Sequence, residues 1–291
     1  MARICGPASV WARIRRIHRK SLHSEGTIET VNQERLHLPK GYSYAATYAG
    51  IRKKPLDDLA LIVSEPAASA AAIFTTNRVK AAPVLVSMQH LAASKGKVRA
   101  VMVNAGNANC ATRTGEAVAI ETSAACAALL GAPVEQILPS STGVIGMELD
   151  GRKITAKLPA LVAALSPASL PQVADAIMTT DTFRKLVTRR VNLSGGTVRI
   201  ARITKGAGMI HPNMATTLSF VMTDAALPAT SIKRLLREGA DQSYHCMSID
   251  GDTSTNDTLL LMANGASGVK VAKDDEAAFR KALFSLLRDL A

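Results

Sequence analysis

Short apolar runs, each followed by Gly, Pro, Asn or another turn residue, recur along the chain from about Leu38. Runs rich in Val, Ile or Leu that end in turn residues are typical of buried strands. The alternating stretch 186–203 has Ser-Gly-Gly at 194–196, which predicts a β-hairpin. The other predicted strands are residues 59–64, 71–75, 83–87, 98–104, 136–138, 217–223 and 259–262.

Helical patterns lie between these runs. Residues 115–130 carry an acidic residue early and alanines through the later turns, which favours a helix. Because strands and helices are mixed without a regular βαβ rhythm or an internal repeat, the pattern predicts an α+β layered fold rather than a doubly wound one. The other predicted helices are residues 154–165, 171–178, 231–244 and 274–290.

The composition limits the class of protein. The 291-residue chain is 47% hydrophobic and 20% charged, which permits a sizeable core and excludes a disordered or fibrous protein. Its apolar runs have strand length, so we expect no membrane-spanning segment. Aromatic residues make up only 3%, so the core must be aliphatic and base-stacking surface is scarce. We therefore expect neither a membrane nor a nucleic-acid partner.

The net charge of +12 is concentrated near the N-terminus. Residues 1–40 hold eight Lys or Arg against three Glu and supply +5 of that charge. Residues 1–37 are interpreted as a basic, disordered tail or, because Ser and His accompany the arginines, as an organellar transit peptide. The tail has no apolar region typical of secretion. We expect a cytoplasmic protein, or a mitochondrial-matrix protein if the tail is a transit peptide.

The sequence gives little reason to expect a metal. The polar run 250–257 could be read as a calcium loop, but it lacks the distant bidentate Glu of an EF-hand. His211 has no second ligand at metal spacing and is interpreted as structural. The cysteines lie far apart without a Cys-x-x-Cys pair, so a reducing compartment fits best. They are Cys5, Cys110, Cys126 and Cys246.

Residues 205–216 form the most unusual segment. Two glycines and a proline make a bent connection into the strand predicted at 217–223, so a constrained backbone meets the hydroxyl of Thr216 at a strand start. A glycine-rich turn with Thr216 as an ordinary β-branched residue explains the same composition. The segment lacks the Gly-Lys-Ser/Thr of a P-loop and the third glycine of a dinucleotide fingerprint, which disfavours nucleotide binding.

Two further clusters combine hydroxyls with special backbone positions. Residues 139–146 place hydroxyls beside Gly143 at a predicted strand end, where a hydroxyl and a backbone N–H can face one point, as an oxyanion hole requires. An ordinary Ser/Gly turn is the alternative. Residues 178–182 place three threonines around Asp181, either as part of a site or as a helix-capping cluster.

Eight motifs, in one order over residues 38–291, resemble the ornithine acetyltransferase family, the bifunctional glutamate N-acetyltransferases of arginine biosynthesis. This resemblance implies an α+β layered sandwich of the ornithine acetyltransferase and N-terminal-nucleophile aminopeptidase type. The motifs are 39–41 (PKG), 58–62 (DLALI), 74–83 (FTTNRVKAAP), 104–109 (NAGNAN), 141–146 (STGVIG), 178–182 (MTTDT), 205–216 (KGAGMIHPNMAT) and 250–258 (DGDTSTNDT).

The resemblance implies a precursor that cleaves its own Ala215–Thr216 bond. The α-chain region would be residues 38–215, and the β-chain region, residues 216–291, would begin at the nucleophile. Cleavage frees the α-amine of Thr216, which can then deprotonate its own Oγ, so no separate base is needed.

Four other residues match functional positions of the family. Thr142 and Gly143 match its oxyanion pair, whereas Thr179 and Lys205, together with Thr216, match its substrate-binding positions. The implied reaction is a ping-pong transfer of the acetyl group from N2-acetyl-L-ornithine to L-glutamate through an acetyl-threonine enzyme. No metal or bound cofactor is implied, and acetyl-CoA stays open as a second acetyl donor.

The resemblance also implies an assembly of two α and two β chains. The nearest rival function is that of an N-terminal-nucleophile aminopeptidase, which would pass its acyl group to water. An inactive truncated fragment and a basic nucleic-acid-binding protein stay open as well, although almost half of the positive charge lies in the tail.

The chain also departs from the family pattern. The family continues past the helix predicted at 274–290, into segments with further binding residues, so we interpret the chain as truncated. We therefore expect an incomplete core, with the strands at 217–223 and 259–262 exposed on one surface, and weak or absent acetyl transfer. Arg184 and Thr217 replace a proline and an apolar residue that the family usually has.

Overall fold

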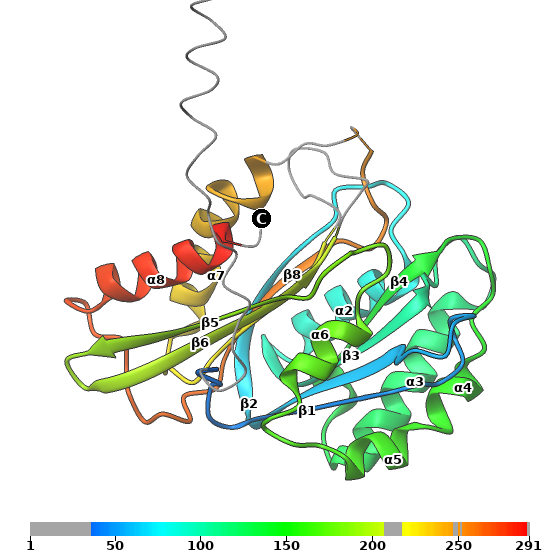
Figure 1. Ribbon diagram of the computed structural model, residues 1–291, viewed down its shortest axis with the longest axis horizontal. Coiled ribbons are helices and arrows are strands. Elements are labelled where there is room, and N and C mark those ends of the chain that lie inside the picture. The colour runs from blue at the N-terminus through cyan, green and yellow to red at the C-terminus, as the bar shows by residue number, and fades with distance from the viewer. Residues whose placement is uncertain (1–35, 207–216, 247–249, 251, 290–291) are drawn as a thin grey trace, which may run out of the picture. The chain divides into compact units, whose positions relative to one another are not determined.

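The computed structural model describes residues 36–206, 217–246, 250 and 252–289. Within this part, an eight-stranded mixed sheet has the order β4-β3-β2-β8-β7-β6-β5, and β1 pairs with β2 (Figure 1). The β3–β4 and β7–β8 pairs are parallel and the others antiparallel. The strands are β1 (Tyr42–Thr47), β2 (Leu59–Phe74), β3 (Lys97–Asn107), β4 (Ile137–Val144), β5 (Lys185–Leu193), β6 (Gly196–Lys205), β7 (Leu218–Thr223) and β8 (Thr258–Ala263).

Strand β2 joins the two halves of the sheet. Its first part pairs with β1, and its last part, from Ser69 to Phe74, pairs with β8. Along its other edge it pairs with β3, with a register shift between Val63 and Ala68. The two strands predicted at 59–64 and 71–75 are therefore one strand of 16 residues.

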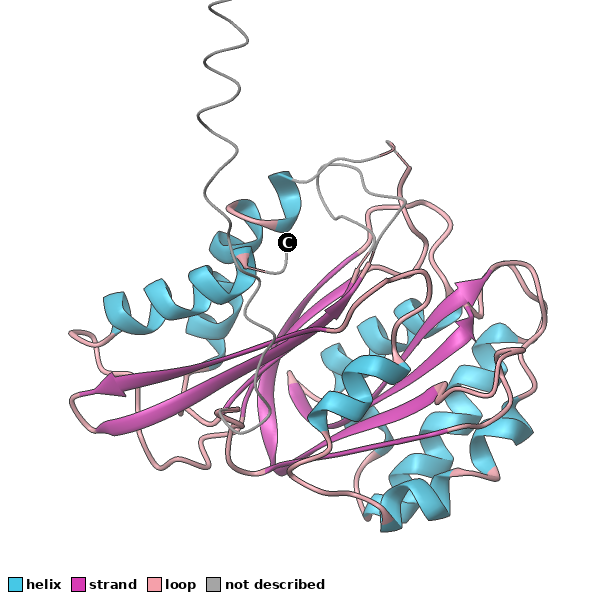
Figure 2. Ribbon diagram, viewed as in Figure 1, coloured by secondary structure: helices cyan, strands magenta, loops and turns pink. Residues whose placement is uncertain are grey.

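Helices gather in two groups beside the sheet (Figure 2). Helix α7 contacts β2 and β8, and α8 contacts β5 and β6, whereas α2 contacts β4 and α5 contacts β1. The sheet with flanking helices agrees with the predicted α+β layered fold. The helices are α2 (Ala82–Ala93), α3 (Gly115–Leu130), α4 (Gly151–Thr155), α5 (Leu158–Ala163), α6 (Leu170–Ala176), α7 (Ala229–Asp241) and α8 (Glu276–Arg288), with 3-10 turns η2 (Val134–Gln136) and η3 (Tyr244–Cys246).

The core is largely aliphatic, as the low aromatic content predicts. One cluster packs strands β5 to β8 against α7 and α8, around residues such as Val221, Leu261 and Leu283. A second packs β1 to β4 against α3, α4 and α5, around residues such as Leu61 and Met102. Burial of each large aliphatic side chain contributes about 1.5–3 kcal/mol, so each half of the sheet has its own stabilising core.

Two local predictions are wrong. Residues 83–87, predicted as a strand, lie in helix α2, because Pro83 occupies the first helical turn and the apolar pattern continues to Ala93. A short buried helix and a buried strand give the same apolar run. The helix predicted at 154–165 is divided between α4 and α5, since Pro159 begins a new helix.

The expectation that the strands at 217–223 and 259–262 are exposed on one surface is also wrong. Every residue of β7 and β8 is buried. Strand β7 pairs with β6 and β8, and β8 pairs with β2 and β7, so both strands lie inside the sheet. Helices α7 and α8 pack against this half of the sheet and cover one face of these two strands.

Candidate functional site

A cleft of about 750 Å³ brings together four of the predicted site residues, Thr142, Gly143, Thr179 and Lys205. They come from the end of β4, from the segment after α6 and from the end of β6. In the sequence, Thr179 lies 26 residues before Lys205, and Thr142 lies 63 residues before it. Only the sheet topology brings them together. Three other named positions, His211, Ala215 and Thr216, lie outside the described residues.

The close contact of β3 and β4 shapes one wall of the cleft. Gly143 pairs with Gly106 in parallel register and has φ +134°, a conformation that favours glycine. A Cβ on Gly143 would lie only 2.2 Å from the carbonyl carbon of Gly106. Because only glycine fits here, the backbone of β4 approaches β3 closely and presents Thr142 and Gly143 at the cleft.

The polar run 250–257 holds this wall in place. The amide Nδ2 of Asn256 donates to the carbonyl oxygens of Ala108 and Ser141, at 2.8 and 2.9 Å. Asn256 therefore connects the start of β8 to the residue before Thr142. Thr75, at the end of β2, donates through Oγ1 to the carbonyl of Ser254 at 2.6 Å. These contacts give the run a structural role at the cleft.

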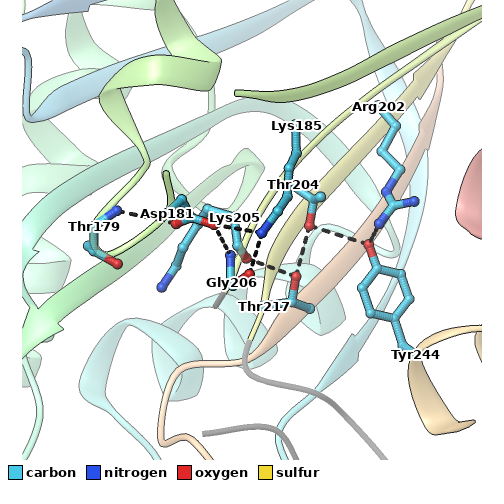
Figure 3. Close-up of polar contacts among 9 residues, drawn as sticks. All are labelled: Thr179, Asp181, Lys185, Arg202, Thr204, Lys205, Gly206, Thr217 and Tyr244. Carbon is cyan, nitrogen blue, oxygen red and sulfur yellow. Dashed lines mark hydrogen bonds and ion pairs between the residues drawn. The ribbon is translucent and has the colours of Figure 1, made fainter. Parts of the chain in front are cut away.

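Asp181 ties the Thr179 segment to the end of β6 (Figure 3). Its side chain, only 1% exposed, accepts hydrogen bonds from Lys185 Nζ at 2.7 Å, from the Gly206 N–H at 2.9 Å and from the Thr179 N–H at 3.4 Å. Lys185 also donates to the Gly206 carbonyl. Burial alone would raise the pKa of Asp181, but the hydrogen bond from Lys185 and those from the two amides lower it below its usual range.

Arg52 supports the residues just before Thr179. Its guanidinium donates to the carbonyls of Ala176 and Met178, both at 2.7 Å, just before Thr179. The carboxylate of the buried Asp58 accepts the backbone N–H of Arg52 at 2.9 Å. Arg52 lines the cleft, and partial burial lowers the pKa of its guanidinium. Sequence reasoning missed Arg52, because the carbonyls that its guanidinium contacts lie more than a hundred residues away.

Lys205 is the buried cation of the cleft, with 5% of its surface exposed. Burial lowers the pKa of its amine to about 8, whereas the carboxylates of Asp181 and Asp257 act to raise it and the charge of Lys185 acts to lower it. The amine is therefore mostly charged at pH 7. A partly desolvated ammonium in a cleft is suited to bind a carboxylate.

The hydroxyl of Thr217 joins a chain of polar contacts at the start of β7. Thr217 Oγ1 donates to the carbonyl of Lys205 at 3.0 Å and lies 2.8 Å from Thr204 Oγ1. The hydroxyl of Tyr244 lies 3.4 Å from Thr204 Oγ1 and accepts a hydrogen bond from the fully buried Arg202 (Figure 3). Thr217, where the family usually has an apolar residue, thus has a hydrogen-bond partner in Thr204.

Arg202 anchors this chain to the end of α8. Its Nη1 donates to the carbonyls of Leu286 and Leu287, at 2.7 and 2.8 Å, and its guanidinium lies 4.8 Å from the centre of the Tyr244 ring. Burial lowers the pKa of Arg202, and the Tyr244 oxygen opposes this effect. A cation at a helix C-terminus interacts favourably with the unpaired carbonyls there. The sequence pattern of β6 gives no sign that Arg202 is buried.

The described residues contain no group of three or more His, Cys, Asp or Glu side chains that could hold a metal ion. In the same part of the chain, no helix is both long and apolar enough to cross a membrane. Cys110 and Cys126 are buried free thiols, and Cys246 is an exposed one.

The chain is similar in sequence to a family of known proteins. The ArgJ family model matches residues 43–291. The arginine biosynthesis bifunctional protein ArgJ of Geobacter sulfurreducens is 48% identical over 81% of this chain and 60% of its own length. The ArgJ protein of Nitratidesulfovibrio vulgaris is 45% identical over 87% of this chain and 64% of its own length. The chain thus spans less than two thirds of the length of these relatives.

Solved structures share the fold. The ArgJ crystal structure from Bacillus halodurans is 36% identical, with a TM-score of 0.57 over 61% of this chain and 92% of that one. Ornithine acetyltransferase from Mycobacterium tuberculosis, complexed with ornithine, is 33% identical, with a TM-score of 0.52 over 60% of this chain and 93% of that one.

A more distant structure extends the fold comparison. The L-aminopeptidase D-Ala-esterase/amidase of Ochrobactrum anthropi, a variant of the Ntn hydrolase fold, is only 11% identical but has a TM-score of 0.54 over 87% of this chain and 83% of that one. The fold predicted from the motifs is confirmed. The family match and the identities above show that the chain belongs to the ArgJ family.

Proposed function

We propose that the chain cleaves its own Ala215–Thr216 bond and then transfers an acetyl group from N2-acetyl-L-ornithine to L-glutamate through acetyl-Thr216. The observation that carries this proposal is one cleft lined by Thr142, Thr179 and Lys205, beside the point where Thr217 begins its path into β7. Thr216 is bonded to Thr217, so the proposed nucleophile is one residue from that point. The cleaved regions would be residues 38–215 and 216–291, with 1–37 as a basic tail.

Cleavage needs only groups of the chain itself and water. The Oγ of Thr216 would attack the carbonyl carbon of Ala215, the amide C–N bond would break, and the nitrogen would take the hydroxyl proton. Water then hydrolyses the resulting ester. The products are the carboxyl end of Ala215 and a Thr216 with a free α-amine beside its hydroxyl, which makes nucleophile and base one residue.

Acetyl transfer would use the same nucleophile twice. Thr216 Oγ attacks the acetyl carbonyl of N2-acetylornithine, ornithine leaves with the proton, and the amine of glutamate then takes the acetyl group from the ester. Each step passes through a tetrahedral oxyanion, for which Thr142 and Gly143 are the proposed donors. The ammonium of Lys205 would bind a substrate carboxylate, and Thr179 would line the same subsite.

The family match supports the transferase over the aminopeptidase, since the ArgJ model covers residues 43–291. The aminopeptidase likeness is one of fold alone, at 11% identity. We also propose that two α and two β chains assemble into one enzyme. Acetyl-CoA stays open as a second acetyl donor, to be tested in the same assay. The proposed reaction uses no metal and no bound cofactor.

The acetyl-enzyme gives the direct test. The purified chain is incubated with N2-acetylornithine labelled in its acetyl group, and peptides are analysed by mass spectrometry. We expect weak labelling of Thr216, release of the label by glutamate, and formation of labelled N-acetylglutamate. Thr142→Ala should slow labelling about 100-fold or more, the cost of one oxyanion donor. Thr155→Ala, in α4, is the matched control and should not slow it.

Two results would count against the proposal. Release of the acetyl group as acetate at the same rate with and without glutamate would favour the aminopeptidase. Label that never reaches Thr216, in a folded sample, would remove the central assignment.

A further inference from the structure

Asp257 is a buried carboxylate, next in sequence to the cleft-lining Asn256, that the proposed mechanism does not use. It directly precedes β8, and only 1% of it is exposed. Strands β7 and β8 are parallel, with Leu218 paired to Thr258. Asp257 therefore lies level with Thr217, the first described residue after the proposed nucleophile.

The contacts of Asp257 fix the start of β7. Its Oδ1 accepts the backbone N–H of Thr217 at 3.0 Å, and the next residue, Thr258, donates its N–H to the Thr217 carbonyl at 2.9 Å. The carbonyl of Asp257 accepts the N–H of Thr75 at 2.9 Å, which ties the segment to the end of β2. Both polar groups of the Thr217 backbone are thus held from the β8 side.

The second carboxylate oxygen, Oδ2, is buried and meets no donor at hydrogen-bond geometry among the residues that the structure describes, although the hydroxyls of Ser254 and Thr75 lie near enough to lower the pKa of the carboxyl. A buried charge without a full set of hydrogen bonds is expensive, and an amide would satisfy the Thr217 N–H equally well. The negative charge itself therefore calls for an explanation. The nearby cation that acts on it is Lys205, which is also buried.

Asp224 shows what a purely structural aspartate looks like in the same sheet. It follows the other end of β7 and is also 1% exposed. Its Oδ1 accepts the N–H of Arg199 at 2.7 Å, and its Oδ2 accepts the N–H of Lys40 at 3.0 Å. Both oxygens are used, and Asp224 lies at the opposite end of β7 from Thr217.

We propose that Asp257 is a positioning residue, whose carboxylate fixes the Thr217 amide next to the nucleophile and holds Lys205 in its charged form. The inference rests on the proposed function for the identity of the nucleophile. Lys205 faces three charged groups: Asp181 from the segment after α6, Lys185 from β5 and Asp257 from the start of β8. Asp250 also lines the cleft. The two carboxylates favour the ammonium and Lys185 opposes it.

The electrostatics agree with this geometry. Burial raises the pKa of Asp257 to about 7, against the effects of the Thr217 N–H, of the Ser254 and Thr75 hydroxyls and of the Lys205 charge. Burial lowers the pKa of Lys205 to about 8. Both groups thus change charge close to neutral pH, and each charge favours the other.

The test compares Asp257→Asn with Asp224→Asn in the 291-residue chain. Asparagine keeps the Oδ1 acceptor for Thr217 and removes only the charge. We expect Asp257→Asn to fold, to move the alkaline limb of the pH profile down by about one unit, since a neighbouring opposite charge shifts a pKa by that order, and so to slow labelling of Thr216 about fivefold at pH 8. Asp224→Asn should leave the profile unchanged.

A direct titration separates this inference from the proposed function. The Lys205 signal in a spectrum of ε-13C-labelled lysines is assigned by its loss in Lys205→Met, and its pKa is measured in each variant. A lower Lys205 pKa in Asp257→Asn alone supports the charge role, even if Thr216 is never labelled and the proposed function fails. An unchanged Lys205 pKa in folded Asp257→Asn overturns the inference, even if the wild type transfers acetyl groups.

Discussion

Replacing Gly143 by alanine tests the close contact of β3 and β4 that shapes the cleft. A Cβ at this position would lie 2.2 Å from the carbonyl carbon of Gly106 and 2.5 Å from the backbone nitrogen of Asn107. These are backbone atoms, so no side-chain rotation can relieve the contact. The strands must separate locally, which endangers the hydrogen bond from the Ala108 N–H to the Val144 carbonyl at 2.9 Å.

Two costs add in Gly143→Ala. The φ of +134° is one that a residue with a Cβ rarely adopts, which costs about 1–2 kcal/mol. Overpacking against a fixed backbone costs about 1–3 kcal/mol more. We therefore expect a loss of about 2–5 kcal/mol, which for a domain of this size lowers Tm by roughly 5–15 °C. Because Thr142 precedes Gly143, self-cleavage should slow as well.

Gly131→Ala is the matched control. Gly131 follows α3 with φ +60°, and a Cβ there would meet nothing within 4 Å. Only the backbone term applies, so we expect a loss of about 1 kcal/mol and unchanged cleavage. Thermal unfolding followed by circular dichroism measures both variants. If Gly143→Ala is no less stable than Gly131→Ala, the strands do not approach as closely as described, and the reasoning fails.

Two other predictions concern the cations of the site. Burial lowers the pKa of Lys205 to about 8, so its charge is lost as the pH rises through that value. The KM for glutamate should therefore rise above pH 8. Lys205→Arg should remove this pH dependence. A pH-independent KM in the wild type would contradict the binding role. Arg202→Met should lower the free energy of unfolding by about 2–3 kcal/mol, since the carbonyls at the end of α8 lose a charged donor. Hydrogen exchange should accelerate in α8, whereas the exposed Arg190→Met should change neither; unaltered exchange in Arg202→Met would show that the buried arginine does not hold the helix.

Much of the local structure follows from the sequence. Helix α3 has the predicted bounds because Gly131 takes the left-handed conformation that ends a helix. The hairpin of β5 and β6 turns at the predicted glycines. The run at 83–87 is mistaken for a strand because its valines suit one, although Pro83 also suits the first turn of a helix. Length, rather than composition, distinguishes the two.

The site is less accessible to sequence reasoning. The motif resemblance indicates Thr142, Gly143, Thr179 and Lys205, and the structure brings all four to one cleft. The groups that hold them, such as Asp181, act through backbone amides of residues distant in sequence. Any residue except proline has a backbone N–H, so such contacts leave no pattern in a single sequence. They depend on topology, which the local patterns do not determine.

The most direct test of the central claim is the intact mass of the purified, folded chain, together with its N-terminal sequences. We expect two chains, the second beginning Thr216-Thr217-Leu218-Ser219-Phe220, and a single uncut chain in Thr216→Ala. A folded wild-type chain that stays intact, or one that is cut at another bond, would contradict the assignment of Thr216 as the nucleophile.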